Sequence, residues 1–141
     1  MSEAPMFKAW DIRRKRVRAV RDIKFFPDGI RVNVAEREED YEPLLNLAGY
    51  DPEFILLRRV GLKDKNGKQS YEGDLVRNGE RLYRIDWGEK NARYGAKTIK
   101  TESVLCKGMT FPLWQYLDED TGVLKLEIVG CSYEFPNLVE V

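Results

Sequence analysis

The chain contains 141 residues, with 24 basic and 24 acidic side chains, no histidine and two cysteines. This length suits one domain, with room for a small subdomain. The absence of histidine excludes Ser-His-Asp and Cys-His catalytic arrangements and every zinc site that needs imidazole. A net charge of zero argues against binding of nucleic acid through bulk charge alone.

The composition is typical of a folded globular protein, since 43% of the residues are hydrophobic and 34% are charged. No apolar run approaches the roughly 20 residues of a membrane span, and the N-terminal residues lack the pattern of a signal peptide. We therefore expect a cytoplasmic protein with no membrane partner. Cys106 and Cys131 are expected to be buried, reduced thiols.

Short segments rich in Val, Ile, Leu, Tyr and Phe alternate with turn signals, which predicts a mainly β protein with little helix. The first predicted hairpin runs from Phe25 to Val34 and turns at Pro27-Asp28-Gly29. Residues 40–48 predict about two turns of helix, with Asp40 as the N-cap. The acidic stretch Glu36–Glu42 suggests a boundary, so we predict an N-terminal β portion over residues 1–50, with the short helix, and a C-terminal β portion over residues 51–141.

A second hairpin is predicted from Asp74 to Trp87, because Asn78-Gly79 is the preferred pair for a type I′ turn. A loop of these two residues places Arg77 opposite Glu80, and Leu75 opposite Leu82.

The last predicted strand covers about Val123 to Tyr133. Apolar residues alternate there with Lys125 and Glu127, which predicts one buried face, and Gly130 marks a bulge.

The segment Gly61–Lys68 is predicted to be a turn between strands. It lacks the Gly-Lys-Ser/Thr ending of a phosphate loop, and Gly73 stands where a calcium loop needs glutamate. Gly73 is expected to adopt unusual backbone geometry, and Asp74 to accept bonds from nearby backbone amides. No motif predicts a catalytic residue, a cofactor or a metal.

A basic segment near the N-terminus is the main candidate for contact with nucleic acid or a partner. It consists of Arg13, Arg14, Lys15, Arg16, Arg18 and Arg21. These cations suit phosphate contacts, with aromatic side chains available for stacking. They equally suit a solvated, charge-protected β edge, or ion pairs with the acidic Glu36–Glu42 stretch or the acidic C-terminal stretch.

Five aromatic residues leave a second choice open. They are Trp10, Trp87, Phe111, Trp114 and Phe135. Aromatic side chains of a small β protein usually fill the core, whereas an exposed set forms a recognition patch.

Three segments together resemble the YopX-like family of phage and prophage proteins. They are Phe7–Asp11, Val60–Lys68 with Tyr71–Asp74, and Glu127–Gly130 with Tyr133, Glu134 and Pro136. The resemblance implies a mainly β fold with an SH3-like barrel in the C-terminal part, and it supplies no catalytic residues. The motif residues are expected to be structural: Trp10, Asp11, Gly61, Leu62, Asp64, Asn66, Gly67, Tyr71, Glu72, Gly73, Asp74, Gly130, Tyr133, Glu134 and Pro136.

Two functions follow as hypotheses. The first is a phage or prophage accessory protein in the cytoplasm of a bacterial host, which is not an enzyme and binds protein, including further copies of itself. The uneven charge supports it, because residues 1–24 hold eight basic and three acidic side chains and residues 117–141 hold six acidic and one basic. The alternative is a nucleic-acid-binding module that uses Arg13–Arg21.

Overall fold

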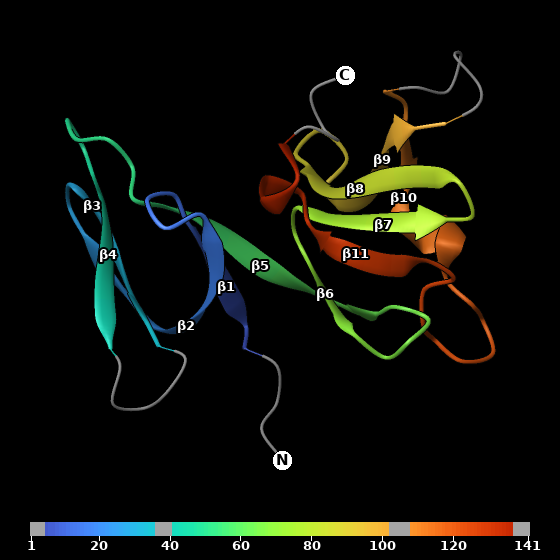
Figure 1. Ribbon diagram of the computed structural model, residues 1–141, viewed down its shortest axis with the longest axis horizontal. Helices are drawn as coiled ribbons and strands as arrows, with labels where there is room; N and C mark the ends of the chain where they lie inside the picture. Colours follow the sequence, from blue (N-terminus) through green and yellow to red (C-terminus); the bar gives the residue numbers. More distant parts are fainter. Residues whose placement is uncertain (1–4, 36–40, 102–107, 137–141) are drawn as a thin grey trace. The chain divides into compact units, whose positions relative to one another are not determined.

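The computed structural model describes residues 5–35, 41–101 and 108–136 of the chain, and these form antiparallel strands and two short 3-10 helices (Figure 1). The elements are β1 Phe7–Asp11, β2 Arg16–Phe26, β3 Gly29–Val34, β4 Glu42–Leu47, β5 Phe54–Lys63, β6 Gln69–Tyr71, β7 Asp74–Asn78, β8 Arg81–Gly88, β9 Arg93–Lys100, β10 Thr110–Pro112, η2 Leu113–Tyr116, β11 Glu127–Cys131 and η3 Ser132–Glu134. The predicted mainly β class is confirmed.

The chain divides into two compact units, residues 1–59 and 60–141. The division falls inside β5, further along the chain than the boundary predicted at residue 50. A strand that continues through the division leaves no linker there, which explains why composition does not mark the point.

The first unit is built on one antiparallel sheet. Its strands follow the order β4-β3-β2-β1-β5, and β6 is the next strand of that sheet after β5. The hairpin predicted to turn at Pro27-Asp28-Gly29 is confirmed, but its loop is Pro27-Asp28 alone, because Gly29 pairs with Phe26 as the first residue of β3. One face of the sheet carries the buried core, which contains Ala9, Val20, Val32, Val34, Leu44 and Phe54.

The helix predicted at residues 40–48 is wrong, because Glu42–Leu47 forms strand β4. β4 pairs with β3 and lies at the edge of the sheet, where Pro43 is tolerated because an edge strand has backbone groups without a ladder partner. The side chain of Asn46 then joins β4 to the start of β5. Its Oδ1 accepts the backbone N–H of Glu53 at 2.8 Å, and its Nδ2 donates to the Phe54 carbonyl at 2.9 Å. Asp40, the predicted N-cap, lies outside the described residues.

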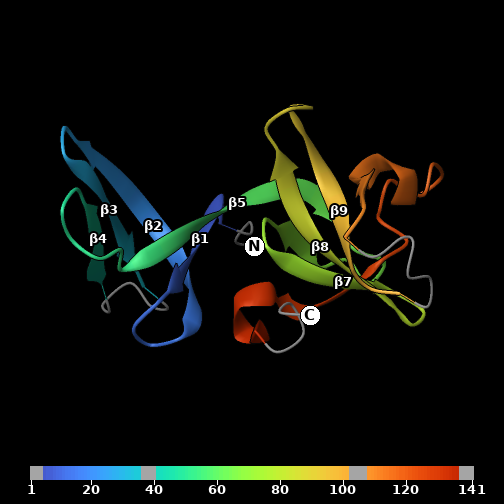
Figure 2. The same ribbon diagram turned by 90° about the horizontal axis from the view of Figure 1, so that it is seen from above.

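The second unit contains a five-stranded antiparallel sheet with the order β10-β9-β8-β7-β11. Its strands β7, β8 and β9 are labelled in Figure 2. The sheet is open at β10 and β11, so the SH3-like barrel implied by the resemblance is not closed. β10 has only three residues and ends at Pro112, which has no N–H to donate to a further strand. One face packs on a core that includes Val76, Tyr83, Ile85, Leu124 and Leu126.

The β7–β8 hairpin forms, but its predicted register is wrong. Asn78 pairs with Arg81, so the loop is Gly79-Glu80 instead of Asn78-Gly79. Gly79 has φ +63° and Glu80 does not have a positive φ, which is the type II′ pattern with glycine first. The shift places Arg77 opposite Leu82, and both residues line a hollow described below.

The last strand is shorter than predicted, because only Glu127–Cys131 forms β11. The predicted burial of Leu124, Leu126 and Ile128 is confirmed. The predicted bulge is also confirmed, since the register with β7 shifts between Ile128 and Gly130. The residues just before β11 form backbone hydrogen bonds with the end of β5 and the turn that follows it. The Leu124 N–H donates to the Lys63 carbonyl at 2.8 Å, and the Lys65 N–H donates to the Leu126 carbonyl at 3.1 Å.

Candidate interaction surfaces

The basic segment lies on the turn after β1 and along β2, where Arg14 and Arg18 join an ion cluster whose buried members are Asp11 and Arg18. The cluster consists of Asp11, Arg14, Arg18 and Glu42. Arg18 is 4% exposed, and its Nη1 lies 3.4 Å from Asp11 Oδ2 and 2.6 Å from Glu42 Oε2. Arg14 donates to Asp11 from its backbone N–H and from Nη1, both at 3.1 Å, and pairs with Glu42. Two positive and two negative charges therefore cancel inside the first unit.

The cluster controls the pKa of both carboxyl groups. Burial by itself would raise the pKa of Asp11, but the hydrogen bonds from the backbone and guanidinium of Arg14, and from Arg18, outweigh it and lower this pKa. The Glu42 pKa is lowered chiefly by the hydrogen bond from Arg18, with a further contribution from Arg14. Both groups are therefore held in the charged form.

This electrostatic arrangement predicts a specific acid sensitivity. A carboxyl group whose pKa is lowered by folding stabilises the protein above its unfolded pKa, and this stabilisation is lost as the pH falls through the folded pKa. We expect the urea midpoint to fall as the pH drops below about 4, the ordinary carboxyl range, and to fall less steeply in Glu42→Gln. Circular dichroism of both proteins over this range provides the measurement. Parallel pH profiles would contradict a stabilising role of the Glu42 charge.

The remaining cations of the basic segment face the solvent. Lys15, Arg16 and Arg21 are exposed, and Arg13 is largely exposed although its Nη2 lies 3.1 Å from Glu53 Oε2. Lys15 stands in the turn with φ +54°, and Arg21 lies where the register of β2 against β3 shifts. Fewer cations are therefore available for phosphate or partner contact than the six in the sequence suggest.

Asp64, a motif residue of the second segment, holds three backbone amides. It is 1% exposed, and its Oδ1 accepts from the N–H of Asn66 at 2.9 Å and of Lys68 at 2.8 Å. Its Oδ2 accepts from Ile128 N–H at 2.9 Å. One carboxylate thus shapes the turn between β5 and β6 and attaches it to β11.

The third motif segment meets the second one at Gly73. This residue has φ +81°, and its carbonyl accepts the N–H of Ser132 at 2.7 Å. The expected bond to Asp74 is present, because Asp74 Oδ2 accepts the Tyr71 N–H at 2.8 Å. Glu134 Oε1 accepts the Cys131 N–H at 3.1 Å.

The motif residues thus differ in exposure. Trp10, Asp11, Asp64, Tyr71, Gly73 and Asp74 are buried, Leu62, Glu72 and Gly130 are half-buried, and Gly61, Asn66, Gly67, Tyr133, Glu134 and Pro136 are exposed.

The five aromatic residues singled out in the sequence do not form one class. Trp10 is buried and Phe111 packs against the core of the second unit, whereas Trp87, Trp114 and Phe135 are exposed. Two aromatic residues that the sequence did not single out, Phe25 and Tyr50, are each 77% exposed.

An acidic loop stands beside Trp114 in the second unit. Asp118 Oδ1 accepts the backbone N–H of Asp120 at 2.9 Å and of Thr121 at 3.3 Å, which directs Glu119 and Asp120 outward. With Trp114, which is 63% exposed, these residues border a hollow of about 570 Å³. The turn signal at Asp118–Gly122 identifies the loop, but the sequence does not show that Trp114 lies beside it.

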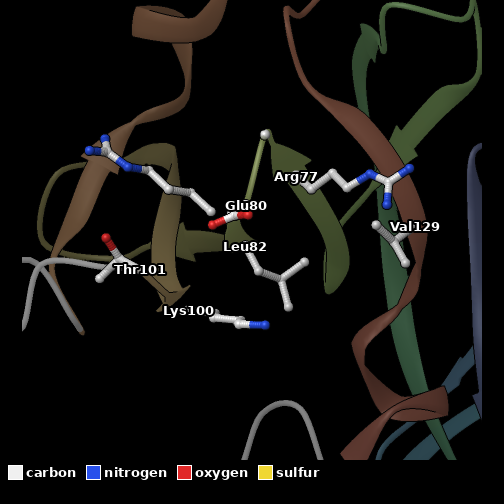
Figure 3. A pocket seen from close by; sticks show the side chains of 8 residues that line it. Arg77, Glu80, Leu82, Lys100, Thr101 and Val129 are labelled. Carbon is white, nitrogen blue, oxygen red and sulfur yellow. The ribbon is translucent and has the colours of Figure 1, made fainter.

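A second hollow, of about 500 Å³, lies at the end of the β7–β8 hairpin (Figure 3). Its lining includes Arg77, Arg81, Leu82, Lys100 and Val129, which come from β7, β8, β9 and β11. Sequence reasoning missed this site, because the predicted hairpin register did not bring Arg77 and Leu82 together.

These features define a two-unit, all-β protein whose described surface includes exposed charged and aromatic side chains. The chain belongs to the YopX family, because the family model described as YopX protein matches residues 6–140. Among solved structures, the chain is similar to the crystal structure of protein EF1440 from Enterococcus faecalis, with 21% identity and a TM-score of 0.51 over 99% of this chain and 100% of that one. This likeness shows a shared fold. No curated protein matches the chain.

Within the described residues, no group of three or more His, Cys, Asp or Glu side chains is placed to hold a metal ion. The described helices include none that is long and apolar enough to cross a membrane. Cys131 is buried, as predicted, and Cys106 lies outside the described residues.

Proposed function

We propose that this YopX-family protein is a non-enzymatic interaction module, serving a phage or prophage in the cytoplasm of a bacterial host, that assembles with further copies of itself and with another protein. One observation supports the proposal above the others. The same chain carries exposed cations at Lys15 and Arg21 and an exposed acidic loop at Glu119 and Asp120.

The two surfaces are complementary in charge and in chemistry. The acidic loop borders a hollow beside an exposed indole, and a basic side chain entering it gains a carboxylate and the face of Trp114. Charges at the rim of such a contact set its orientation and speed of formation, and the aromatic surface supplies affinity. Because the two surfaces differ, each contact joins Lys15 and Arg21 of one copy to the acidic loop of another. Such a heterologous contact closes into a ring or continues as a filament.

Charge reversal tests this assembly. We expect that Lys15→Glu/Arg21→Glu and Glu119→Lys/Asp120→Lys each reduce self-association in sedimentation velocity. An equal mixture of the two variants regains it, because each variant keeps one native surface and the reversed surfaces again attract each other. Lys65→Glu/Lys68→Glu, an equal change of charge at other exposed positions, is the control and is expected to behave as the wild type.

A wild-type protein that stays monomeric at every concentration would overturn the proposed assembly. So would reversal variants that associate as the wild type does.

Nucleic acid is the alternative ligand of the exposed cations. If oligothymidine binds the wild type with affinity that falls steeply with salt, and Lys15→Glu/Arg21→Glu abolishes this binding, the nucleic-acid-binding function replaces the first proposal.

A further inference from the structure

The hollow at the end of the β7–β8 hairpin combines an apolar floor with a cationic border. Leu82 lies opposite Arg77 on β7 and opposite Lys100 on β9, so a leucine is flanked by two cations across three adjacent strands. Neighbouring strands are about 4.8 Å apart, which places the two cationic residues on either side of one apolar position. Figure 3 shows Val129 beside the side chain of Arg77, which extends the apolar surface.

The charges of the lining favour an anionic ligand. Arg77 is oriented by Glu127 on β11, whose Oε2 accepts from Nε at 3.1 Å and from Nη2 at 3.0 Å. A guanidinium has five N–H donors, so this pair leaves donors on Arg77 for a second acceptor. Arg81 and Lys100 add two more cations, and Glu80 is the one carboxylate among the residues that line the hollow in the described part of the chain.

A protein segment fits this lining better than a nucleic acid does. Single-stranded nucleic acid is usually held by aromatic side chains that stack on its bases, and the described residues around this hollow include no aromatic side chain. Leu82 and Val129 instead offer contacts to aliphatic side chains. The volume of about 500 Å³ lies in the range of small-ligand sites, which suits a few residues of a peptide.

We propose that this hollow binds a short peptide segment of a partner protein in which acidic residues are interspersed with leucine or valine. The carboxylates pair with Arg77, Arg81 and Lys100, and the aliphatic side chains pack on Leu82 and Val129. The site is separate from the surfaces proposed for self-association, since it includes none of Lys15, Arg21, Glu119 and Asp120.

Fluorescence anisotropy with a labelled peptide, Ser-Glu-Leu-Asp-Val-Glu-Leu-Ser, tests the proposal on the full chain. We expect saturable binding that Arg81→Glu/Lys100→Glu weakens by about tenfold or more, because two exposed ion pairs become repulsive. Lys65→Glu/Lys68→Glu carries the same change of charge and is expected to bind as the wild type. Peptides with lysine in place of the acidic residues, or serine in place of leucine and valine, are expected to lose affinity.

Three results would overturn the peptide site. The first is equal weakening by the control variant, which would show unspecific attraction. The second is unchanged affinity of the serine-substituted peptide, which would remove the apolar floor from the argument. The third is tighter binding of oligothymidine than of the acidic peptide at this hollow. Because Arg81→Glu/Lys100→Glu keeps the self-association surfaces, its sedimentation behaviour distinguishes failure of this site from failure of the proposed assembly.

Discussion

Replacing Arg18 by methionine is expected to lower the free energy of unfolding by about 3 kcal/mol, because breaking a buried ion pair leaves the buried Asp11 carboxylate with less compensating charge. Arg18 is the buried arginine of the ion cluster, and like Arg14 it contacts both carboxylates, with Asp11 at 3.4 Å and Glu42 at 2.6 Å. Its loss leaves Asp11 buried with Arg14 as its guanidinium partner among the four residues of the cluster. Urea denaturation followed by circular dichroism measures the change.

Arg21→Met on the same strand is the matched control, since Arg21 is exposed, and we expect it to alter stability by no more than about 0.5 kcal/mol. Asp11→Asn/Arg18→Met is expected to regain part of the lost stability, because the buried charge that Arg18 helped to compensate is then absent. Equal effects of Arg18→Met and Arg21→Met would refute the role of the cluster. No recovery in the double variant would assign the loss to packing of the arginine stem instead.

Asp64→Ala is expected to cost about 2–4 kcal/mol, since it removes the acceptor of three backbone N–H groups. Water reaches the two amides of the exposed turn, but the N–H of Ile128 lies in a buried strand, so most of the loss is expected there. Asp64→Asn is expected to lose less, because its one amide oxygen in the Oδ2 position still accepts from Ile128 while water reaches the two turn amides. The urea midpoints of the two variants give the comparison.

Asp118 provides an internal comparison for this prediction. It accepts two backbone amides in an exposed turn, as Asp64 does, but it has no third bond to a buried strand. Asp118→Ala is therefore expected to cost about 1 kcal/mol or less, the usual contribution of exposed turn bonds. Similar losses in Asp64→Ala and Asp118→Ala would show that the bond to Ile128 contributes little.

Local signals were sufficient where neighbouring residues determine the backbone. Pro27-Asp28 predicts the β2–β3 turn because proline restricts φ and aspartate favours turns. The alternation of Leu124, Leu126 and Ile128 predicts their burial, because successive side chains of an extended chain point to opposite faces. The unusual backbone geometry of Gly73 and the backbone hydrogen bond to the Asp74 carboxylate were predicted for the same local reasons.

Local signals failed where the choice depended on distant residues. At residues 40–48 the sequence matched a short helix, but β3 and the start of β5 offered bonds to Asn46 and the backbone of β4. At Asn78-Gly79 one glycine was compatible with two turn types, each of which gives a different hairpin register. In the observed register β7 also pairs with β11, and β8 also pairs with β9. The basic segment was visible as charge, and its pairing with the Glu36–Glu42 stretch was one of the alternatives, but the sequence did not show that Arg14 and Arg18 make this contact or that Asp11 joins it.

The sequence by itself determined the β class, the family motifs, most turns and the opposite charges of the two ends, because these depend on residue type and on spacing over a few positions. The tertiary structure decided which charges remain available. It brought Glu42 and Asp11 onto Arg18 from two other strands, and it aligned Arg77, Leu82 and Lys100 on three strands. Such contacts depend on strand order and register, which are set by the packing of the whole sheet and not by any one segment.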